Sequence, residues 1–164
     1  MQFETFWSDT LATILGGIIL TILFFLLKEK IFSFPKITGR WYFKMHIKNT
    51  AYKPYENMVL EYVAMLWREG NIIKGTVEKI YEKSSKGEQE FVGKNRTRGN
   101  IEGYIEKNYI TKDRLFLHII EDGYERKSTH FYELAFQSNK NMLGKFYSTV
   151  ADQDGTALWQ RNKF

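Results

Sequence analysis

An uncharged apolar stretch near the N-terminus constrains the fold of this chain more than any other feature. Residues 11–27 read LATILGGIILTILFFLL and contain no charged side chain. At about 1.5 Å rise per residue, and extended by Phe6 and Trp7, the stretch reaches the lower end of the length that crosses about 30 Å of hydrocarbon. It therefore predicts one membrane-spanning helix. A buried hairpin of a soluble core is the alternative, but the rest of the sequence offers no equally apolar partner.

The charges on either side of this stretch predict its orientation. No Lys or Arg precedes it, and five basic residues follow it: Lys28, Lys30, Lys36, Arg40 and Lys44. Basic residues collect on the cytoplasmic side of a span, and a cleaved signal peptide needs a basic N-terminal region that is missing here. We therefore expect an uncleaved single-pass anchor at residues 1–30, a juxtamembrane linker at 31–37, and a cytoplasmic domain at 38–164.

After the linker, turn-forming residues recur at the spacing that is typical of an all-β domain. In the first segment Trp41, Phe43 and Met45 alternate with polar or basic residues, so one face of a strand enters the core. Short Gly, Asn, Asp and Ser clusters separate segments of about ten residues and imply antiparallel neighbours. A sheet that closes into a ring leaves no exposed strand edge, so the pattern predicts a small eight-stranded antiparallel up-and-down barrel. The expected strands are 39–48, 58–68, 72–82, 96–110, 114–121, 128–136, 143–150 and 156–161.

One of these segments fits two structures. Residues 58–67 (MVLEYVAMLW) place Val59, Tyr62 and Leu66 on a helical stripe that follows Asn57, a good helix cap. The content of Val, Tyr and Trp favours a strand instead, and the Glu-Gly-Asn that follows favours a hairpin turn. We predict the strand.

Charge points to anionic neighbours. The whole chain carries +5, and the part beyond residue 27 carries +7, because residues 1–27 hold two acidic and no basic side chains. Phosphates of the inner leaflet and a phosphate-bearing ligand are the two candidate partners. The chain has no Cys, which excludes disulfides, thiol nucleophiles and thiolate metal sites.

Catalytic and metal-binding patterns are missing from the sequence. His46, His118 and His130 fall on three different expected strands, without a paired spacing that would suit a metal. Neither a GxSxG elbow nor a glycine-rich phosphate loop follows a strand. We predict no enzyme activity, no metal site and no cofactor.

The densest basic patch is the best candidate for ligand binding. Arg96, Arg98 and Asn100 occupy alternate positions that lead toward Tyr104, and guanidinium groups bind phosphate oxygens bidentately. The alternative is a solvated basic edge that prevents aggregation. Three further rings lie on strands where they could line a cavity, with ordinary barrel-wall positions as the alternative. The predicted ligand-binding residues are Arg96, Arg98, Asn100, Tyr104, His118, Tyr132 and Tyr147.

Trp41 and Arg161 form a second candidate pair. They lie on the first and last expected strands, which are neighbours in a closed barrel. An Arg over an indole ring would close the barrel by a cation–π contact. A role in ligand binding is the alternative.

Small residues in the anchor suggest that helices associate. Ala12 and Gly16 are four residues apart, and so are Gly17 and Thr21, the spacing that lets two membrane helices approach closely. We predict a homo-oligomer with these four residues at the helix interface, although small residues also occur in single spans without a packing role.

The anchor, the Gly39-Arg40-Trp41 start of the first strand, the glycine-punctuated hairpins and the closing GTALWQR strand at 155–161 resemble a known family. This is the family of membrane-anchored β-barrel effectors of bacterial cyclic-oligonucleotide anti-phage signalling, as in CBASS and the related Panoptes systems. The resemblance implies a barrel that receives a cyclic di- or trinucleotide from a partner synthase. It also implies membrane helices that assemble and disrupt the bacterial inner membrane. The family typically carries two such helices, and this sequence shows one.

We therefore expect an anti-phage membrane effector that contacts the lipid bilayer and binds no DNA or RNA polymer. Gly-x-Trp with a closing Arg is also similar to lipocalins, so the alternative is a membrane-anchored, lipocalin-like binder of a small apolar ligand. A purely structural barrel that docks another protein is the third possibility. Arg and Lys side chains that face the barrel interior would favour nucleotide binding. Apolar cavity walls would favour the lipocalin-like binding of an apolar ligand, and a core filled by side chains would favour the docking role.

Overall fold

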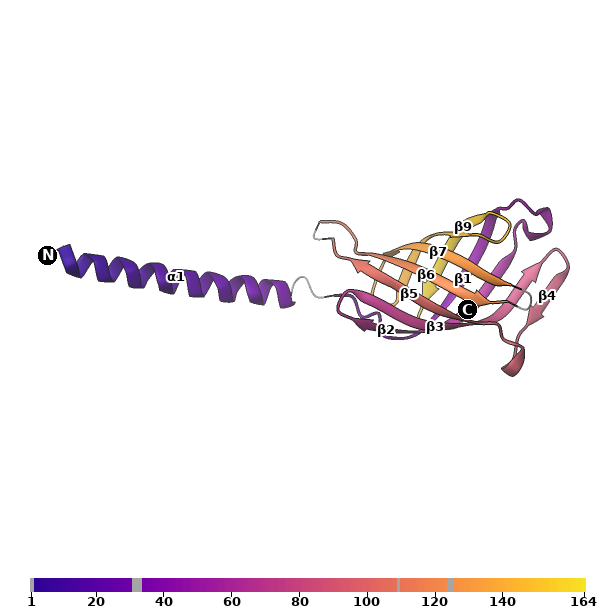
Figure 1. Ribbon diagram of the computed structural model, residues 1–164, viewed down its shortest axis with the longest axis horizontal. Coiled ribbons are helices and arrows are strands. Elements are labelled where there is room, and N and C mark those ends of the chain that lie inside the picture. Colours follow the sequence, from indigo (N-terminus) through magenta and orange to yellow (C-terminus); the bar gives the residue numbers. More distant parts are fainter. Residues whose placement is uncertain (1, 31–33, 109, 124–125) are drawn as a thin grey trace. The chain divides into compact units, whose positions relative to one another are not determined.

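The structure is a computed structural model in which the chain forms two units, Met1–Phe34 and Pro35–Phe164. Figure 1 shows a single long helix and a barrel of strands. The structure describes residues 2–30, 34–108, 110–123 and 126–164.

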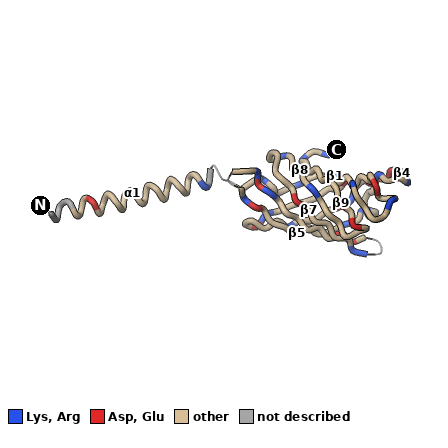
Figure 2. Tube along the Cα trace, turned by 90° about the horizontal axis from the view of Figure 1, so that it is seen from above, with Lys and Arg blue, Asp and Glu red and all other residues tan. Residues whose placement is uncertain are grey.

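The N-terminal unit is one helix, α1, at Gln2–Lys30. Its segment Phe6–Lys28 is long and apolar enough to cross a membrane by length and composition. Figure 2 shows this helix almost free of charged residues, whereas Lys, Arg, Asp and Glu are spread over the barrel. Its described threonines donate their hydroxyl hydrogens to carbonyls four residues earlier, as Thr21 does to Gly17 at 2.8 Å. These bonds satisfy the polar groups that an apolar medium would otherwise leave unpaired.

The four residues of the predicted helix interface are exposed within the described part of α1. Ala12 and Gly16 lie one turn apart, as do Gly17 and Thr21. A Cβ atom added at either glycine would meet nothing within 4 Å. The surface they form is therefore open to another helix, and the association itself stays a prediction.

The C-terminal unit is a closed antiparallel barrel, as the sequence predicts. Each barrel strand pairs with the next along the chain, and β1 pairs with β9 to close the ring. The elements are β1 (Gly39–Asn49), η1 (Lys53–Tyr55), β2 (Val59–Glu69), β3 (Ile72–Ser84), β4 (Gly87–Glu90), η2 (Gly93–Asn95), β5 (Arg98–Glu106), β6 (Arg114–Asp122), β7 (Lys127–Phe136), β8 (Asn141–Ser148) and β9 (Gln153–Gln160).

The segment after Met58 forms strand β2, so the choice of strand over helix is confirmed. The sequence did not predict β4, a short strand that pairs only with the end of β3. Its four residues, GEQE, are polar and exposed, so no alternation marks them. Strand β5 also ends earlier than the predicted 110, because the carboxylate of Asp113 accepts the backbone N–H of Asn108 at 2.9 Å and turns the chain into a loop.

Aromatic rings fill the middle of the barrel. Phe43 stacks on Trp159 with ring centroids 4.0 Å apart and on Tyr62 at 4.7 Å. Tyr132 meets Phe43 and Trp159 edge-on at 5.8 and 5.9 Å. Trp41 is also fully buried. These five rings come from β1, β2, β7 and β9, so they connect opposite walls of the ring of strands.

Two glycines show how closely the strands approach one another. A Cβ atom at Gly144 would lie 1.8 Å from the carbonyl oxygen of Glu133, and one at Gly155 would lie 2.0 Å from that of His46. Neither contact can be relieved without moving backbone. Glycine is therefore required at these two positions by the neighbouring strand rather than by a ligand.

Arg161 closes the barrel at the end where β1 begins. Its guanidinium carbon lies 3.9 Å from the centre of the Trp41 ring, so the predicted contact is present. The same group donates to three backbone oxygens before and at the start of β1: those of Lys36 at 2.7 Å, Thr38 at 3.1 Å and Arg40 at 2.9 Å. One side chain after the last strand therefore holds the start of the first.

We expect Arg161→Gln to lower the free energy of unfolding by about 1–3 kcal/mol, because charged donors to the three carbonyls and the cation–π contact are lost together. Trp41 itself keeps its hydrogen bond to the Ile37 carbonyl at 2.6 Å, so the core should remain packed. Urea unfolding of the full chain in detergent would measure the loss. Lys48→Gln removes the same charge from an exposed β1 position and serves as the control. Equal midpoints for the two variants would contradict the closing role.

Candidate functional site

The predicted ligand-binding residues of β5 do not face the interior. In this strand Gly99, Ile101 and Ile105 are buried, whereas Arg98, Asn100 and Tyr104 occupy the alternate exposed positions. No Lys or Arg is buried among the described residues of the barrel. The observation that would favour a nucleotide inside the barrel, inward-facing Arg and Lys, is therefore not made among these residues, because the outward positions of the strands carry the basic side chains.

Tyr132 is the predicted ligand residue that does face inward. It is 3% exposed, and its hydroxyl donates to the sulfur of Met45 at 2.9 Å. Burial raises the pKa of Tyr132 well above its ordinary value, and the nearby charge of Glu121 acts in the same direction. Its ring is packed in the core described above, so Tyr132 is a core residue.

His118 and Tyr147, also predicted to bind a ligand, lie on the outer wall. The ring of His118 stacks on Phe131 with centroids 4.8 Å apart, and Phe131 pairs across the strands with Tyr147. Tyr104 stacks on Phe116 at 5.1 Å in the adjoining row. We call these five residues, on β5 to β8, the ring band.

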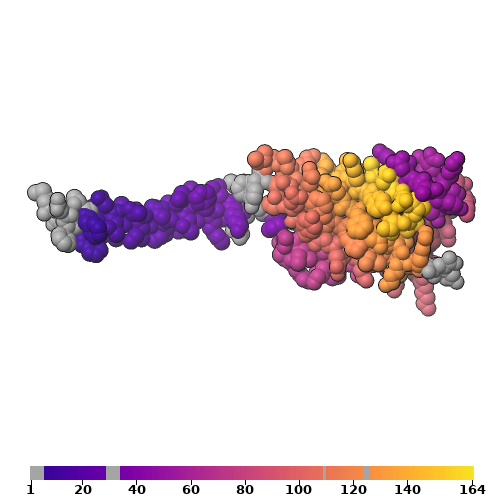
Figure 3. Space-filling model, turned by 45° about the horizontal axis from the view of Figure 1, so that its top comes forward, coloured from indigo at the N-terminus to yellow at the C-terminus, as the bar shows by residue number. Residues whose placement is uncertain are grey.

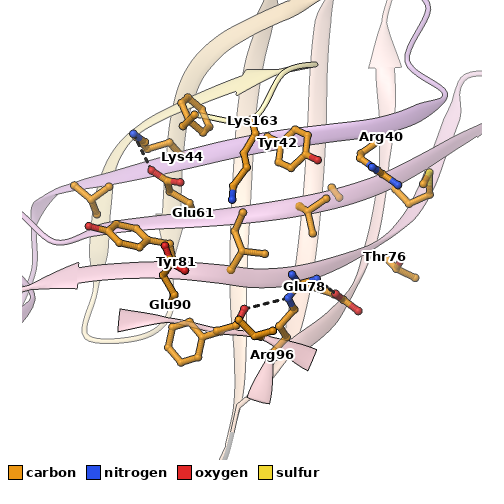
Figure 4. Close-up of a pocket in the computed structure, with 18 of the residues that line it drawn as sticks. Arg40, Tyr42, Lys44, Glu61, Thr76, Glu78, Tyr81, Glu90, Arg96 and Lys163 are labelled. Atoms are coloured by element: carbon orange, nitrogen blue, oxygen red, sulfur yellow. Dashed lines mark hydrogen bonds and ion pairs between the residues drawn. The ribbon is translucent and has the colours of Figure 1, made fainter. Parts of the chain in front are cut away.

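A groove on the outer wall is the strongest candidate site. Its floor is the outward face of β1, β2 and β3, and its walls come from residues 90–96 and from Lys163 and Phe164 (Figure 4). Its volume is about 920 Å³. The residues that line it are Arg40, Tyr42, Lys44, Val59, Glu61, Val63, Ala64, Met65, Thr76, Glu78, Ile80, Tyr81, Lys83, Glu90, Phe91, Val92, Arg96, Lys163 and Phe164.

The groove holds five basic and three acidic side chains, so it carries a positive excess. Carboxylates hold three of the bases in place. Arg96 also donates to the Phe91 carbonyl at 3.1 Å, which fixes it against the groove wall. The ion pairs are Lys44–Glu61 at 2.8 Å, Arg96–Glu78 at 2.9 Å and Lys83–Glu88 at 2.6 Å.

Arg40 and Lys163 differ from the other three bases. Among the described residues, no carboxylate lies within ion-pair distance of either side chain. Both are exposed, and Figure 4 shows Lys163 extended across the groove toward its floor. Their charges are therefore available to an anion that enters the groove.

Rings and aliphatic side chains accompany these charges. Tyr42, Tyr81, Phe91 and Phe164 line the groove, and the ammonium of Lys44 lies 4.4 Å from the centre of the Phe164 ring. A hydrogen bond to Glu88 raises the pKa of the Tyr81 hydroxyl above its ordinary value. The groove can therefore offer cations to phosphates and ring faces to bases.

Of the groove residues, only Arg96 is among the predicted ligand-binding residues; Arg40, Tyr42 and Lys44 are not. A signal for them was present. The alternation that places Trp41 in the core puts Arg40, Tyr42 and Lys44 together on the other face of the first strand. The alternation does not predict the groove wall made by residues 90–96, because the path of these residues over β3 depends on strand β4, which the sequence did not predict.

One polar cluster lies inside the barrel. Glu121 is 6% exposed and accepts the hydroxyl hydrogen of Tyr62 at 3.0 Å. His130 Nε2 lies 3.5 Å from the same carboxylate, and neither ring nitrogen of His130 has a hydrogen-bond partner among the described residues. Burial, followed by the charge of Glu121, raises the pKa of Tyr62 well above its ordinary value. The described residues contain no group of three or more potential metal ligands.

No protein-family model matches the sequence, and no curated protein matches it. Solved structures do match the fold. The redesigned β-barrel mFAP1 bound to DFHBI has a TM-score of 0.54 at 11% identity, over 76% of this chain and 94% of that one. EF1p2_mFAP2b bound to DFHBI has a TM-score of 0.55 at 11% identity, over 77% and 94%. The redesigned barrel b11L5F_LGL has a TM-score of 0.51 at 9% identity, over 77% and 92%. The chain therefore has the fold of a small closed β-barrel, preceded by an apolar helix long enough to span a membrane.

Proposed function

We propose that this chain is a membrane-anchored receptor whose barrel binds a cyclic di- or trinucleotide in the β1–β3 groove. The observation that carries the proposal is the basic, ring-lined groove in which Arg40 and Lys163 have no carboxylate partner among the described residues. Its volume of about 920 Å³ falls within the range of about 300–1,000 Å³ that suits small ligands. The site thus moves from the expected barrel interior to the outer wall.

The proposal extends to an effector role in anti-phage defence, with the nucleotide supplied by a partner synthase. The groove includes Arg40, whose backbone oxygen is also bound by Arg161. A ligand that binds Arg40 and Lys163 therefore contacts residues next to Arg161, whose stacking on Trp41 closes the barrel. A ligand shifts an equilibrium toward the state that it binds better. In this proposal, the state favoured by the nucleotide is one in which the anchor helices of neighbouring copies pack differently, and this packing controls the integrity of the inner membrane. The function requires binding and no catalytic step.

The filled middle of the barrel meets the condition named above for a docking role and places any small-ligand site outside the barrel. The lipocalin-like alternative receives no support from it. An apolar ligand needs an internal cavity, and stacked rings of Phe43, Tyr62 and Trp159 occupy the described middle of the barrel. The structure of the redesigned barrel mFAP1 has DFHBI bound, which supports the capacity of a small barrel of this fold to bind a small ligand. The charges of the groove favour an anionic one.

Isothermal titration of the full chain in detergent with a panel of cyclic di- and trinucleotides tests the proposal. We expect saturable heat with at least one member, with an affinity that falls as salt rises because the contacts are ionic. Linear dinucleotides serve as the matched control, since they carry the same bases without the ring closure. No heat with any member of the panel would overturn the proposal.

A further inference from the structure

We propose that the end of the barrel at which β1 begins rests on the surface of an anionic bilayer. The antiparallel order of the strands brings the β2–β3 turn, the β5–β6 loop and the β7–β8 loop to this same end. Figure 3 shows the β2–β3 hairpin (purple to magenta) and the β5–β6 loop (orange) there. Exposed apolar and basic side chains surround this end, and we call them the linker-end rim: Trp67, Ile72, Ile110, Leu143, Lys36, Lys112 and Lys140.

The apolar members of the rim face solvent in the chain alone. Ile110 is 97% exposed in the β5–β6 loop, and Leu143, Ile72 and Trp67 are 48%, 47% and 40% exposed. Ile72 lies opposite Tyr104 of the ring band, so the apolar surface continues from the rim onto the outer wall. Exposed apolar groups that gather in this way mark interaction sites, and Trp is enriched where a membrane meets water.

The basic members identify the occupant as anionic. Among the described residues, no carboxylate lies within ion-pair distance of Lys36, Lys112 or Lys140, and all three are exposed. The one acidic side chain of residues 107–113 and 137–140 is Asp113, which is paired with Lys107 at 2.7 Å. Lysines beside apolar groups place their methylene stems in a membrane interface and their ammonium groups among the lipid phosphates. The rim therefore matches an anionic bilayer in both of its parts.

The chain itself brings a bilayer to this end of the barrel. Arg161 binds the carbonyls of residues 36 and 38, so this segment is fixed to the barrel. Only residues 31–35 separate it from the end of α1 at Lys30, and five residues span at most about 18 Å whatever path they take. With α1 in a membrane, a soluble partner would have to enter this short space, whereas lipid headgroups already lie within reach of the rim.

This inference rests on the membrane anchoring proposed above and not on nucleotide binding in the β1–β3 groove. It goes beyond attachment, because a tether alone leaves the barrel free to turn. Docking of the rim gives the barrel one orientation, with the loops of the opposite end directed into solution. Failure of every nucleotide to bind would leave it intact.

The chain has no Cys, so single cysteines that carry an environment-sensitive fluorophore can test the docking in the full chain. In vesicles of equal parts phosphatidylcholine and phosphatidylglycerol, nitroxide-labelled lipid should quench a label at Ile110→Cys severalfold more than one at Lys86→Cys. Lys86 is the matched control, because it is exposed in the β3–β4 turn at the opposite end of the barrel. Flotation of the labelled chain with the vesicles measures anchoring by α1 separately.

The outcomes distinguish this inference from the anchoring. Equal quenching at both positions, in a chain that floats, would overturn the docking and leave the anchor intact. A chain that does not float would overturn both. A label at Ile110→Cys that is shielded from iodide in the aqueous phase, yet is not quenched by the nitroxide lipid, would mean that protein covers the rim, and this too would overturn the proposal.

A charge reversal tests the role of the lysines. In the Ile110→Cys background, Lys112→Glu with Lys140→Glu should lower the ratio of docked to undocked barrels about tenfold, because attraction to lipid phosphates becomes repulsion. Lys53→Glu with Lys86→Glu changes the net charge by the same amount at the opposite end and should leave the quenching unchanged. Vesicles of phosphatidylcholine alone should reproduce the loss in the unreversed chain. Equal effects of the two pairs would contradict docking through the rim.

Discussion

Replacing Phe43 by Ala is expected to lower the free energy of unfolding of the barrel by about 3–5 kcal/mol. Phe43 is 1% exposed and stacks on both Trp159 and Tyr62, so its removal leaves a cavity between rings that come from three strands. The surrounding indole and phenol rings cannot collapse into this space without breaking the pairing of β1 with β2 and β9. Equilibrium unfolding in urea, followed by tryptophan fluorescence, measures the loss.

The neighbouring residue supplies the control. Tyr42 is an aromatic residue of the same strand whose side chain faces outward into the groove. Tyr42→Ala removes a similar ring without opening a core cavity and should cost about 1 kcal/mol or less. Equal losses for the two variants would mean that the barrel interior is not the packed core that the ring contacts indicate.

The barrel itself could be predicted from the sequence because its signals are local. The alternation that buries Trp41 and Phe43, and turn residues such as Gly70-Asn71, specify strand faces and hairpins without any long-range information. Arg161 and Trp41 could be paired because a closed ring makes the first and last strands neighbours. The short strand β4 could not be predicted, because its polar residues obtain their only order from pairing with β3.

The site could be predicted only in part. Basic and aromatic residues were expected to carry the function, but inside the barrel. The inside is filled, because eight strands leave room for little more than side chains, and stacked rings occupy its described middle. Arg98, for example, is 70% exposed at its side chain and pairs with Glu78 on the outer wall. The groove forms where residues 90–96 cross the outside of the barrel, an arrangement that no local pattern encodes.

Reversal of the two unpaired groove cations is expected to have the largest effect on function. Arg40→Glu combined with Lys163→Glu should weaken cyclic-nucleotide binding about a hundredfold, because two attractive contacts with phosphate become repulsive. Neither residue has a carboxylate partner among the described residues, so the reversal breaks no ion pair seen in the structure. The unfolding midpoint should therefore stay close to that of the unmodified chain. Titration calorimetry in detergent gives the affinities.

A second pair of reversals separates contact from long-range attraction. Lys48→Glu with Lys140→Glu changes the net charge of the chain by the same amount, and both residues are exposed outside the groove. Screening over about 10 Å at 0.1 M salt should leave this pair with an effect of only a few-fold. If both pairs weakened binding equally, the attraction would come from the overall positive charge and the groove would lose its assignment. If only the Arg40 and Lys163 pair did so, those two side chains would be in contact with the phosphates, because at this ionic strength only short-range charges retain so large an effect.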